Sequence, residues 1–322
     1  MAHQIEGNYA FFGDKLPAWH GIGHVLKDAP TPEKAWSLAY PHNLFQYDIS
    51  AKMPDGNGGA FYHDAPGYSA IVRDDGKVLG IHSDKYGLTQ PFEVFKRFEP
   101  LIDSGLVELH AGGSLCEGRK MWALAKIKGG DADILPNDTI RAYLLFQTSF
   151  DGSCVAGAGF TGVRVVCANT LAMAQNDVTF RTKHTKNVNR RLDAYRDDVA
   201  QTLLAFRENV ENMRTLARKQ VTRASQETYI RHVIVGPEPK EAPREISTKL
   251  ENKVAEVVEL LDTQKGLKDL PKMRGTAWQA YNAVTEYITH KAGRTVDSRV
   301  DSQWFGANAR LNQTALDLAL AL

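Results

Sequence analysis

Cysteine is scarce in this sequence of 322 residues. Cys116, Cys154 and Cys167 are the three that occur, and they form neither a Cys-x-x-Cys pair nor a metal-ligand spacing. Few cysteines, odd in number, are typical of a protein from a reducing compartment. We therefore expect no disulfide framework, and cysteines that serve as small core residues of a cytoplasmic protein.

Long hydrophobic runs are also missing. No apolar stretch approaches the ~20 residues that a transmembrane helix needs, and the first residues lack the basic and apolar regions of a signal peptide. With 43% hydrophobic residues, the chain can nevertheless bury the core of one large domain or of two smaller ones. These features predict a soluble protein without a membrane partner.

The chain has almost no net charge, since 39 Lys and Arg stand against 38 Asp and Glu. Five of the cations, however, lie within residues 181–191, a stretch that contains no acid and leaves 34 basic against 38 acidic residues elsewhere. They are Arg181, Lys183, Lys186, Arg190 and Arg191, with His184 among them. Fixed cations without counter-charges concentrate polyanions, nucleic acid above all. The alternative interpretation is a solvated loop that leads into a helix.

Further cations and aromatic residues are expected beside this basic segment. Arg119 and Lys120 begin one predicted strand, Arg164 lies on another, and Phe150 lies in the loop between two predicted strands. A positive groove combined with aromatic stacking platforms is how sequence-tolerant proteins hold single strands. We therefore predict that these four residues join the five cations in a nucleic-acid-binding site, the alternative for the aromatic being a place in the core.

Three parts of the chain differ in their patterning. Residues 1–65 are rich in aromatics and turn formers, residues 66–190 read as hairpin strands around one helix, and residues 191–322 follow a helical period. Because no regular βαβ alternation occurs, we predict an α+β fold, in which an antiparallel β-sheet core packs on a helix and a mostly helical C-terminal part follows. The prolines within residues 236–243 cannot continue a helix and predict a linker there.

Local signals place the elements within these parts. An Asp-Asp-Gly turn at 74–76 between two apolar runs predicts a hairpin, and Pro91 opens a helix expected to reach about residue 104. A helix of about 27 residues is expected from Leu192 onwards. A short helix is predicted at 170–175. Thr248 with Glu251, and Thr276 with Gln279, form the capping-box pattern ahead of two further helices.

Two motifs that suggest cofactor chemistry fail on their context. Residues 157–162 match Gly-x-Gly-x-x-Gly, but a strand-like run follows where a dinucleotide site needs a helix N-terminus. His20 and His24 are four residues apart, but glycines interrupt them and no glutamate follows the first histidine. We therefore expect no cofactor and no metal, and nothing in the sequence specifies a catalytic mechanism.

Several strings spread over nearly the whole chain resemble those of one family. They are Trp19–His24, Ser83–Tyr86, Gly118–Ala125, Asp151–Ser153, Val163–Leu171, Lys183–Lys186, Gly275–Tyr287 and Trp304–Gly306. Together they resemble the phage/plasmid-like proteins called domain of unknown function 932. The resemblance implies a mobile-element context and assigns no reaction. Gln279 stands where we would expect glycine in many relatives, and this departure favours a regular helix.

These observations lead to one functional prediction and two alternatives. We expect a non-enzymatic single-stranded-DNA-binding protein of a phage or mobile element, which promotes strand annealing in recombination and which could self-associate. The predicted order of elements is also similar, in topology alone, to that of single-strand annealing recombinases. The first alternative is a phage protein that binds a host protein through its helical C-terminal part. The second is a His-dependent metalloenzyme.

Overall fold

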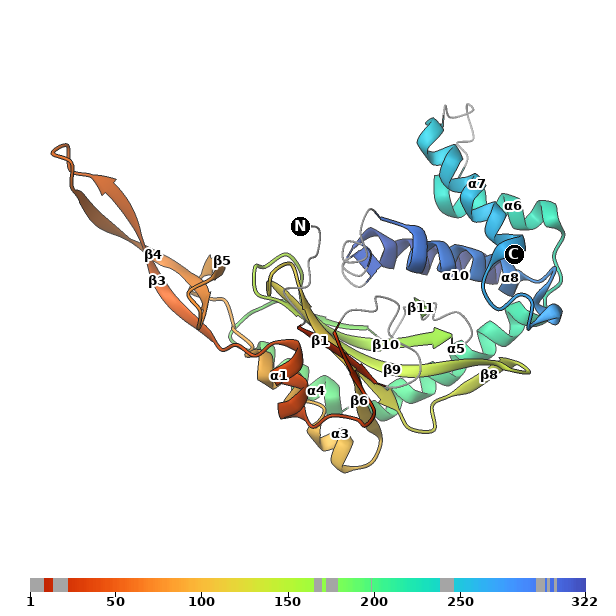
Figure 1. Ribbon diagram of the computed structural model, residues 1–322, viewed down its shortest axis with the longest axis horizontal. Coiled ribbons are helices and arrows are strands. Elements are labelled where there is room, and N and C mark those ends of the chain that lie inside the picture. Colours follow the sequence, from red (N-terminus) through yellow and green to blue (C-terminus); the bar gives the residue numbers. More distant parts are fainter. Residues whose placement is uncertain are drawn as a thin grey trace.

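The computed structural model describes residues 9–13, 23–164, 170–171, 179–197, 199–237, 246–293, 299, 302–303 and 306–322. A large sheet forms the centre of the molecule, a narrow β-arm projects from one side, and a group of helices stands on the other (Figure 1). This is the predicted α+β fold, with an antiparallel core followed by a mostly helical C-terminal part. None of the described helices is both long and apolar enough to cross a membrane.

The central sheet contains nine strands in the described residues, in the order β11-β10-β9-β7-β6-β1-β2, with β12 paired to β10 and β8 to β9. Among these pairs, β1 with β2 is parallel and the others are antiparallel. The strands are β1 (Ala10–Gly13), β2 (His24–Leu26), β6 (Val107–Leu115), β7 (Lys120–Ile127), β8 (Ala132–Leu135), β9 (Asp138–Ser149), β10 (Ala156–Arg164), β11 (Thr170–Leu171) and β12 (Thr179–Thr182).

Short helices cover one face of this sheet. They are α1 (Pro32–Ala39), α2 (Pro91–Lys96) and α3 (Glu99–Asp103). Phe95 and Phe98 from this layer are fully buried, and the ring of Phe98 meets Phe146 of the sheet edge-on, with the ring centroids 5.0 Å apart. The sequence predicted a single helix from Pro91 to about residue 104, but the structure has two helices there, α2 and α3. The break precedes Pro100, the second residue of α3, which has no backbone N–H to continue the hydrogen bonds of the preceding helix.

The projecting arm is a separate three-stranded antiparallel sheet in the order β3-β4-β5. Its strands are β3 (Leu44–Pro54), β4 (Ala60–Arg73) and β5 (Val78–Ser83). The turn predicted at 74–76 does join β4 to β5, and Gly76 has a positive φ of 86° there. The boundary predicted between residues 65 and 66 falls inside β4, so the aromatic segment and the strands after it form one continuous structure.

The C-terminal part contains five long helices among the described residues. They are α5 (Val199–Arg218), α6 (Arg223–Val235), α7 (Thr248–Thr263), α8 (Ala277–Glu286) and α10 (Ala307–Ala321). Helix α4 (Val188–Asp197) precedes them. A 3₁₀ turn, η1 (Pro271–Met273), comes before α8, and a π-helical turn, η2 (Tyr287–Lys291), follows it. The boundary predicted between residues 190 and 191 lies inside α4. Most of the linker predicted at 236–243 lies outside the described residues.

Local predictions were confirmed in part. The Thr276 side chain caps α8 by accepting a hydrogen bond from the backbone N–H of Gln279 at 3.1 Å. Helix α7 instead begins one residue earlier than predicted, with Ser247 in the N-cap position. The helix predicted at 170–175 is wrong at its start, because Thr170 and Leu171 pair with β10 as strand β11, and its remainder lies outside the described residues.

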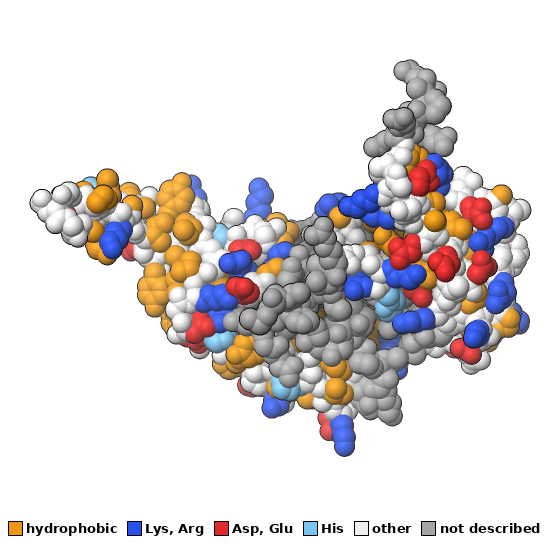
Figure 2. Space-filling view, turned by 45° about the horizontal axis from the view of Figure 1, so that its top comes forward, with side chains coloured by type: hydrophobic (Ala, Val, Ile, Leu, Met, Phe, Trp, Pro, Cys, Tyr) orange, Lys and Arg blue, Asp and Glu red, His pale blue; other side chains and the backbone are white. Residues whose placement is uncertain are grey.

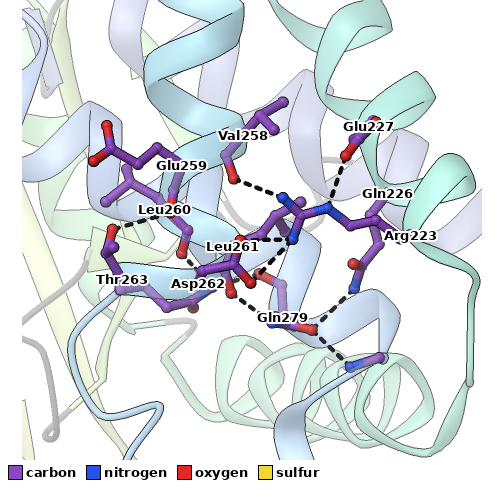
Figure 3. A network of polar contacts seen from close by, with 12 residues as sticks. Arg223, Gln226, Glu227, Val258, Glu259, Leu260, Leu261, Asp262, Thr263 and Gln279 are labelled. Carbon is purple, nitrogen blue, oxygen red and sulfur yellow. Dashed lines mark hydrogen bonds and ion pairs between the residues drawn. The ribbon is translucent and has the colours of Figure 1, made fainter.

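Helix α8 is the centre of the helical part, since every residue from Ala277 to Glu286 is buried. Both the nitrogen and the oxygen of the buried Gln279 amide form hydrogen bonds, as Figure 3 shows. Its Nε2 donates to the carbonyl of Leu261 at 2.6 Å, and its Oε1 accepts from the N–H of Gly275 at 2.7 Å and from Gln226 Nε2 at 3.1 Å. One side chain thereby joins α6, α7 and the start of α8.

We predict that Gln279→Ala lowers the free energy of unfolding by about 3 kcal/mol, because the carbonyl of Leu261 and the N–H of Gly275 lose this partner and Gln226 Nε2 keeps only the carbonyl of Thr276. Arg223→Gln is the matched control in the same network (Figure 3). Arg223 is 44% exposed where it pairs with Glu227 and Asp262, so its replacement should cost no more than about 1 kcal/mol. Denaturant unfolding measures the free energy of unfolding of both variants. Equal losses of stability would contradict the central role that we assign to Gln279.

Candidate nucleic-acid interface

The basic segment, residues 181–191, connects strand β12 to helix α4. Arg181 pairs with Gly157 in the central sheet, and its side chain lies outside what the structure describes. The side chains of the other four cations are all exposed, namely Lys183, Lys186, Arg190 and Arg191. Of these, Arg191 donates a hydrogen bond to Thr182 Oγ1 at 3.2 Å. The segment therefore presents four cations to solvent within nine residues, and we call these four the row.

The backbone of this row is fixed by the loop after β5. Thr185 forms an isolated antiparallel bridge with Tyr86, and the N–H of Gly87 donates to the carbonyl of His184 at 3.2 Å. A Cβ atom at Gly87 would come within 2.1 Å of the Thr185 carbonyl oxygen, so only glycine allows this approach. On the far side, Val188 anchors α4 in the core.

Three rings stack beneath the row. The His82 and Tyr86 ring centroids are 4.0 Å apart, and those of Tyr86 and His184 are 5.0 Å apart, with interplanar angles of 15° and 18°. The Tyr86 hydroxyl donates to the carbonyl of Ser149 at 3.0 Å, and His82 Nε2 hydrogen-bonds to the carbonyl of Phe150 at 2.8 Å. This stack ties the basic segment to the end of β9.

Burial controls the charge of the stacked rings. It lowers the pKa of His184 below its usual value, so this imidazole is neutral at pH 7 and adds nothing to the positive charge of the row. Burial likewise raises the pKa of the Tyr86 hydroxyl, which therefore stays protonated and able to donate. The positive charge at this site comes from lysine and arginine side chains.

The sheet brings Arg119 and Lys120 to the same edge. Lys120 on β7 pairs with Ser149 on β9, and Ala156 on β10 pairs with Thr182 on β12, so four neighbouring strands end here. Three strand spacings separate β7 from β12, which is about 14 Å. Arg119 is exposed and Lys120 is half-buried. The two predicted groups of cations thus lie at the same end of the sheet, about 14 Å apart from backbone to backbone across its strands.

Two predicted site residues do not belong to this surface. Arg164 is fully buried and paired with Asp138 through two hydrogen bonds, from Nε at 2.5 Å and from Nη2 at 2.8 Å. Phe150 is also fully buried, against Tyr40. The predictions that Arg164 contacts phosphates and that Phe150 stacks on bases were therefore wrong, since neither side chain is accessible.

One group of described side chains has ligand atoms close enough to hold a metal ion, namely His42, Asp74 and Asp75. His42 Nδ1 is hydrogen-bonded to Asp74 Oδ1 at 2.6 Å, and Arg73 pairs with Asp75 and holds the pKa of that carboxyl far below its usual range. These contacts hold the three side chains in the turn, and the buried Nε2 of His42 has no hydrogen-bond partner among the described residues. Of the two histidines whose spacing was rejected as a metal motif, His20 lies outside the described residues and His24 is exposed on β2.

Residues 78–310 match the family described as Domain of unknown function (DUF932). The chain belongs to this family. Neither the curated proteins nor the solved structures contain a significant match. Three of the strings that carried the resemblance, Ser83–Tyr86, Asp151–Ser153 and Lys183–Lys186, converge around the stacked rings, since Tyr86 stacks on His184 and a Cβ at Gly152 would lie 3.1 Å from the His82 ring. Nearly 100 residues separate the first string from the last.

The ring stack could not be predicted from the sequence. Ser83–Tyr86 and Lys183–Lys186 both carry the family resemblance, but nothing in their spacing shows that Tyr86 and His184 meet. The basic segment was predictable because charge is readable from sequence. The contacts that hold this segment in place were not predictable, because they depend on pairing between distant parts of the chain.

We predict that Arg164→Met lowers the free energy of unfolding by about 3–5 kcal/mol, because it leaves Asp138 buried without its counter-charge. Arg190→Gln also removes one cation, but from an exposed position, and should change stability by no more than ~0.5 kcal/mol. Thermal or denaturant unfolding of both variants tests this difference. A destabilisation by Arg190→Gln as large as that by Arg164→Met would refute it.

Proposed function

We propose that the protein binds single-stranded nucleic acid through the exposed cations of the basic segment. The observation that carries this proposal is the row of Lys183, Lys186, Arg190 and Arg191, which is exposed and has no acid within it. Such a row neutralises phosphates and releases their counterions, whatever the sequence of the bases. Arg119 at the same edge of the sheet extends the row across the strand ends.

A single strand fits this surface better than a duplex does. Helix α4 contributes two of the exposed cations, Arg190 and Arg191, whereas Lys183 and Lys186 lie in the loop before it, so the charge is not gathered on one helix face that could enter a major groove. A row of cations on a loop and one helical turn can instead follow one flexible backbone. The stacking contribution expected from Phe150 is absent, so the proposed binding is mainly electrostatic.

Strand annealing is the activity that we propose for this binding. Complementary strands repel each other through their phosphates, and a protein that neutralises part of this charge favours their encounter. The mobile-element context and the role in recombination belong to this proposal. The rival surface for a host protein was expected on the helical part, yet every large hydrophobic side chain found exposed in the described residues lies at or before residue 106.

We predict that replacing Lys183, Lys186, Arg190 and Arg191 together by Gln weakens oligonucleotide binding and reduces its salt dependence. The slope of log affinity against log salt should fall by up to ~2.8, which is about 0.7 for each phosphate of a single strand that the variant no longer neutralises. Titrations of labelled single- and double-stranded oligonucleotides at rising salt measure this slope. Annealing of complementary strands by the same variant should slow in parallel.

A matched control removes the same charge elsewhere. Lys249, Lys268, Lys272 and Arg274 are four exposed cations of the helical part, and replacing them by Gln should leave the slope almost unchanged. An equal reduction in both variants would mean that net charge, rather than this segment, governs binding. Unchanged affinity in the first variant, or stronger binding to duplex than to single strands, would overturn the proposal.

A further inference from the structure

The outer face of the β-arm is apolar and exposed. Cross-strand pairing aligns Phe45, Val72 and Val78 in one row and Tyr47, Ala70 and Ile81 in the next, and Tyr68 follows on β4. Side chains alternate between the two faces of a strand, so these residues share one face. The opposite face carries Leu44, Ile71 and Leu79, which are buried in the core.

Most of the exposed hydrophobic surface in the described residues lies on this arm. Eight large hydrophobic side chains between residues 45 and 81 are 43–66% exposed, and Figure 2 shows hydrophobic groups gathered over the arm. They are Phe45, Tyr47, Met53, Phe61, Tyr62, Tyr68, Val78 and Ile81. Monomeric soluble proteins rarely expose a contiguous apolar patch of this extent.

The part of the arm beyond the irregularity between Asp48 and Ser50 has only two strands, since β5 pairs with β4 from Tyr68 onwards. Met53 pairs with Phe61 near its tip. A two-stranded ribbon with no core of its own is marginally stable in water. A contact with another molecule would stabilise this extension.

The charge of the arm argues against a polyanionic ligand. Residues 44–83 contain five acidic and three basic side chains. Two of the three cations are already in ion pairs, Arg73 with Asp75 and Lys77 with Glu117. A surface of net negative charge repels phosphates, so the exposed aromatic rings face a protein rather than a nucleic acid.

We propose that two copies of this chain associate through the outer face of the arm. A dimer with two-fold symmetry uses the same patch on both partners, and an apolar sheet face with few charges is complementary to itself. Phe61 and Tyr62 are neighbours on β4 and point to opposite faces, so at most seven of the eight side chains share the outer face. With about 100 Å² of exposed surface on each, the contact would bury at most about 700 Å² per partner, within the range of a standard stable interface. This proposal is independent of the proposed nucleic-acid binding.

Sedimentation equilibrium of the full-length, nuclease-treated protein tests the proposal. The wild-type protein should be dimeric at micromolar concentration, and Tyr47→Glu with Ile81→Glu should raise the dimer dissociation constant at least about 100-fold, because interface energy concentrates in central aromatic and aliphatic anchors. Both side chains face solvent in the single chain, so the variant should keep the wild-type circular dichroism spectrum, and its unfolding midpoint should differ only by what dimerisation adds. Val25→Glu with Leu106→Glu is the control, since these exposed hydrophobics lie outside the arm.

Three results would overturn the proposal. The first is a wild-type protein that stays monomeric at ~100 μM, where even a weak dimer with a Kd of ~10 μM is mostly associated. The second is an arm variant that dimerises as tightly as the wild type or as the control. The third is an arm variant that keeps its association state but loses affinity for oligonucleotides, which would make the arm a strand-binding surface instead.

Discussion

The buried ion pair between Arg164 and Asp138 is the contact on which the joining of the sheet to the helical part depends. It links β10 to β9, and Trp278 of α8 donates from Nε1 to Asp138 Oδ2 at 2.8 Å, while Arg164 donates to Asn282 Oδ1 at 3.1 Å. Two desolvated charges cost several kcal/mol unless every partner is in place. The geometry that satisfies them therefore fixes where α8 stands relative to the sheet.

The same constraint separates two kinds of cation in this chain. Arg164 neutralises a single buried carboxylate and is unavailable to any ligand, whereas the cations after β12 have no acid within their segment and face solvent. The sequence alone could not separate the two cases. Asp138 is 26 residues away from Arg164 and Asn282 is 118 residues away, so the environment of Arg164 is set by tertiary contacts that local patterning does not encode.

Features governed by local chemistry were predictable. The turn before β5 follows from Asp-Asp-Gly, the start of α8 from the Thr276 side chain, and the exposure of the basic segment from the density of charge. Features that depend on pairing were not. Thr170 lies in an apolar run that suits a helix equally well, and its strand conformation follows from pairing with Val163 of β10. The aromatic residues before residue 66 were assigned to a segment rich in turn formers, because prolines and glycines lie among them, and the structure shows that they belong to paired strands with an irregularity between Asp48 and Ser50.

The two proposed binding surfaces, the basic segment and the outer face of the β-arm, are separated in sequence. Different forces would drive binding at each of them. The basic segment attracts phosphates over a distance and weakens as salt rises, while the arm is net acidic and its association would depend on apolar burial, which salt does not screen. An assembly of two copies would hold two basic segments together. A strand bound by one segment would then meet the second at a raised effective concentration, and the same holds for two complementary strands. The near-zero net charge of the chain is consistent with this arrangement, because it limits the repulsion between copies while the cations remain concentrated at one edge of the sheet.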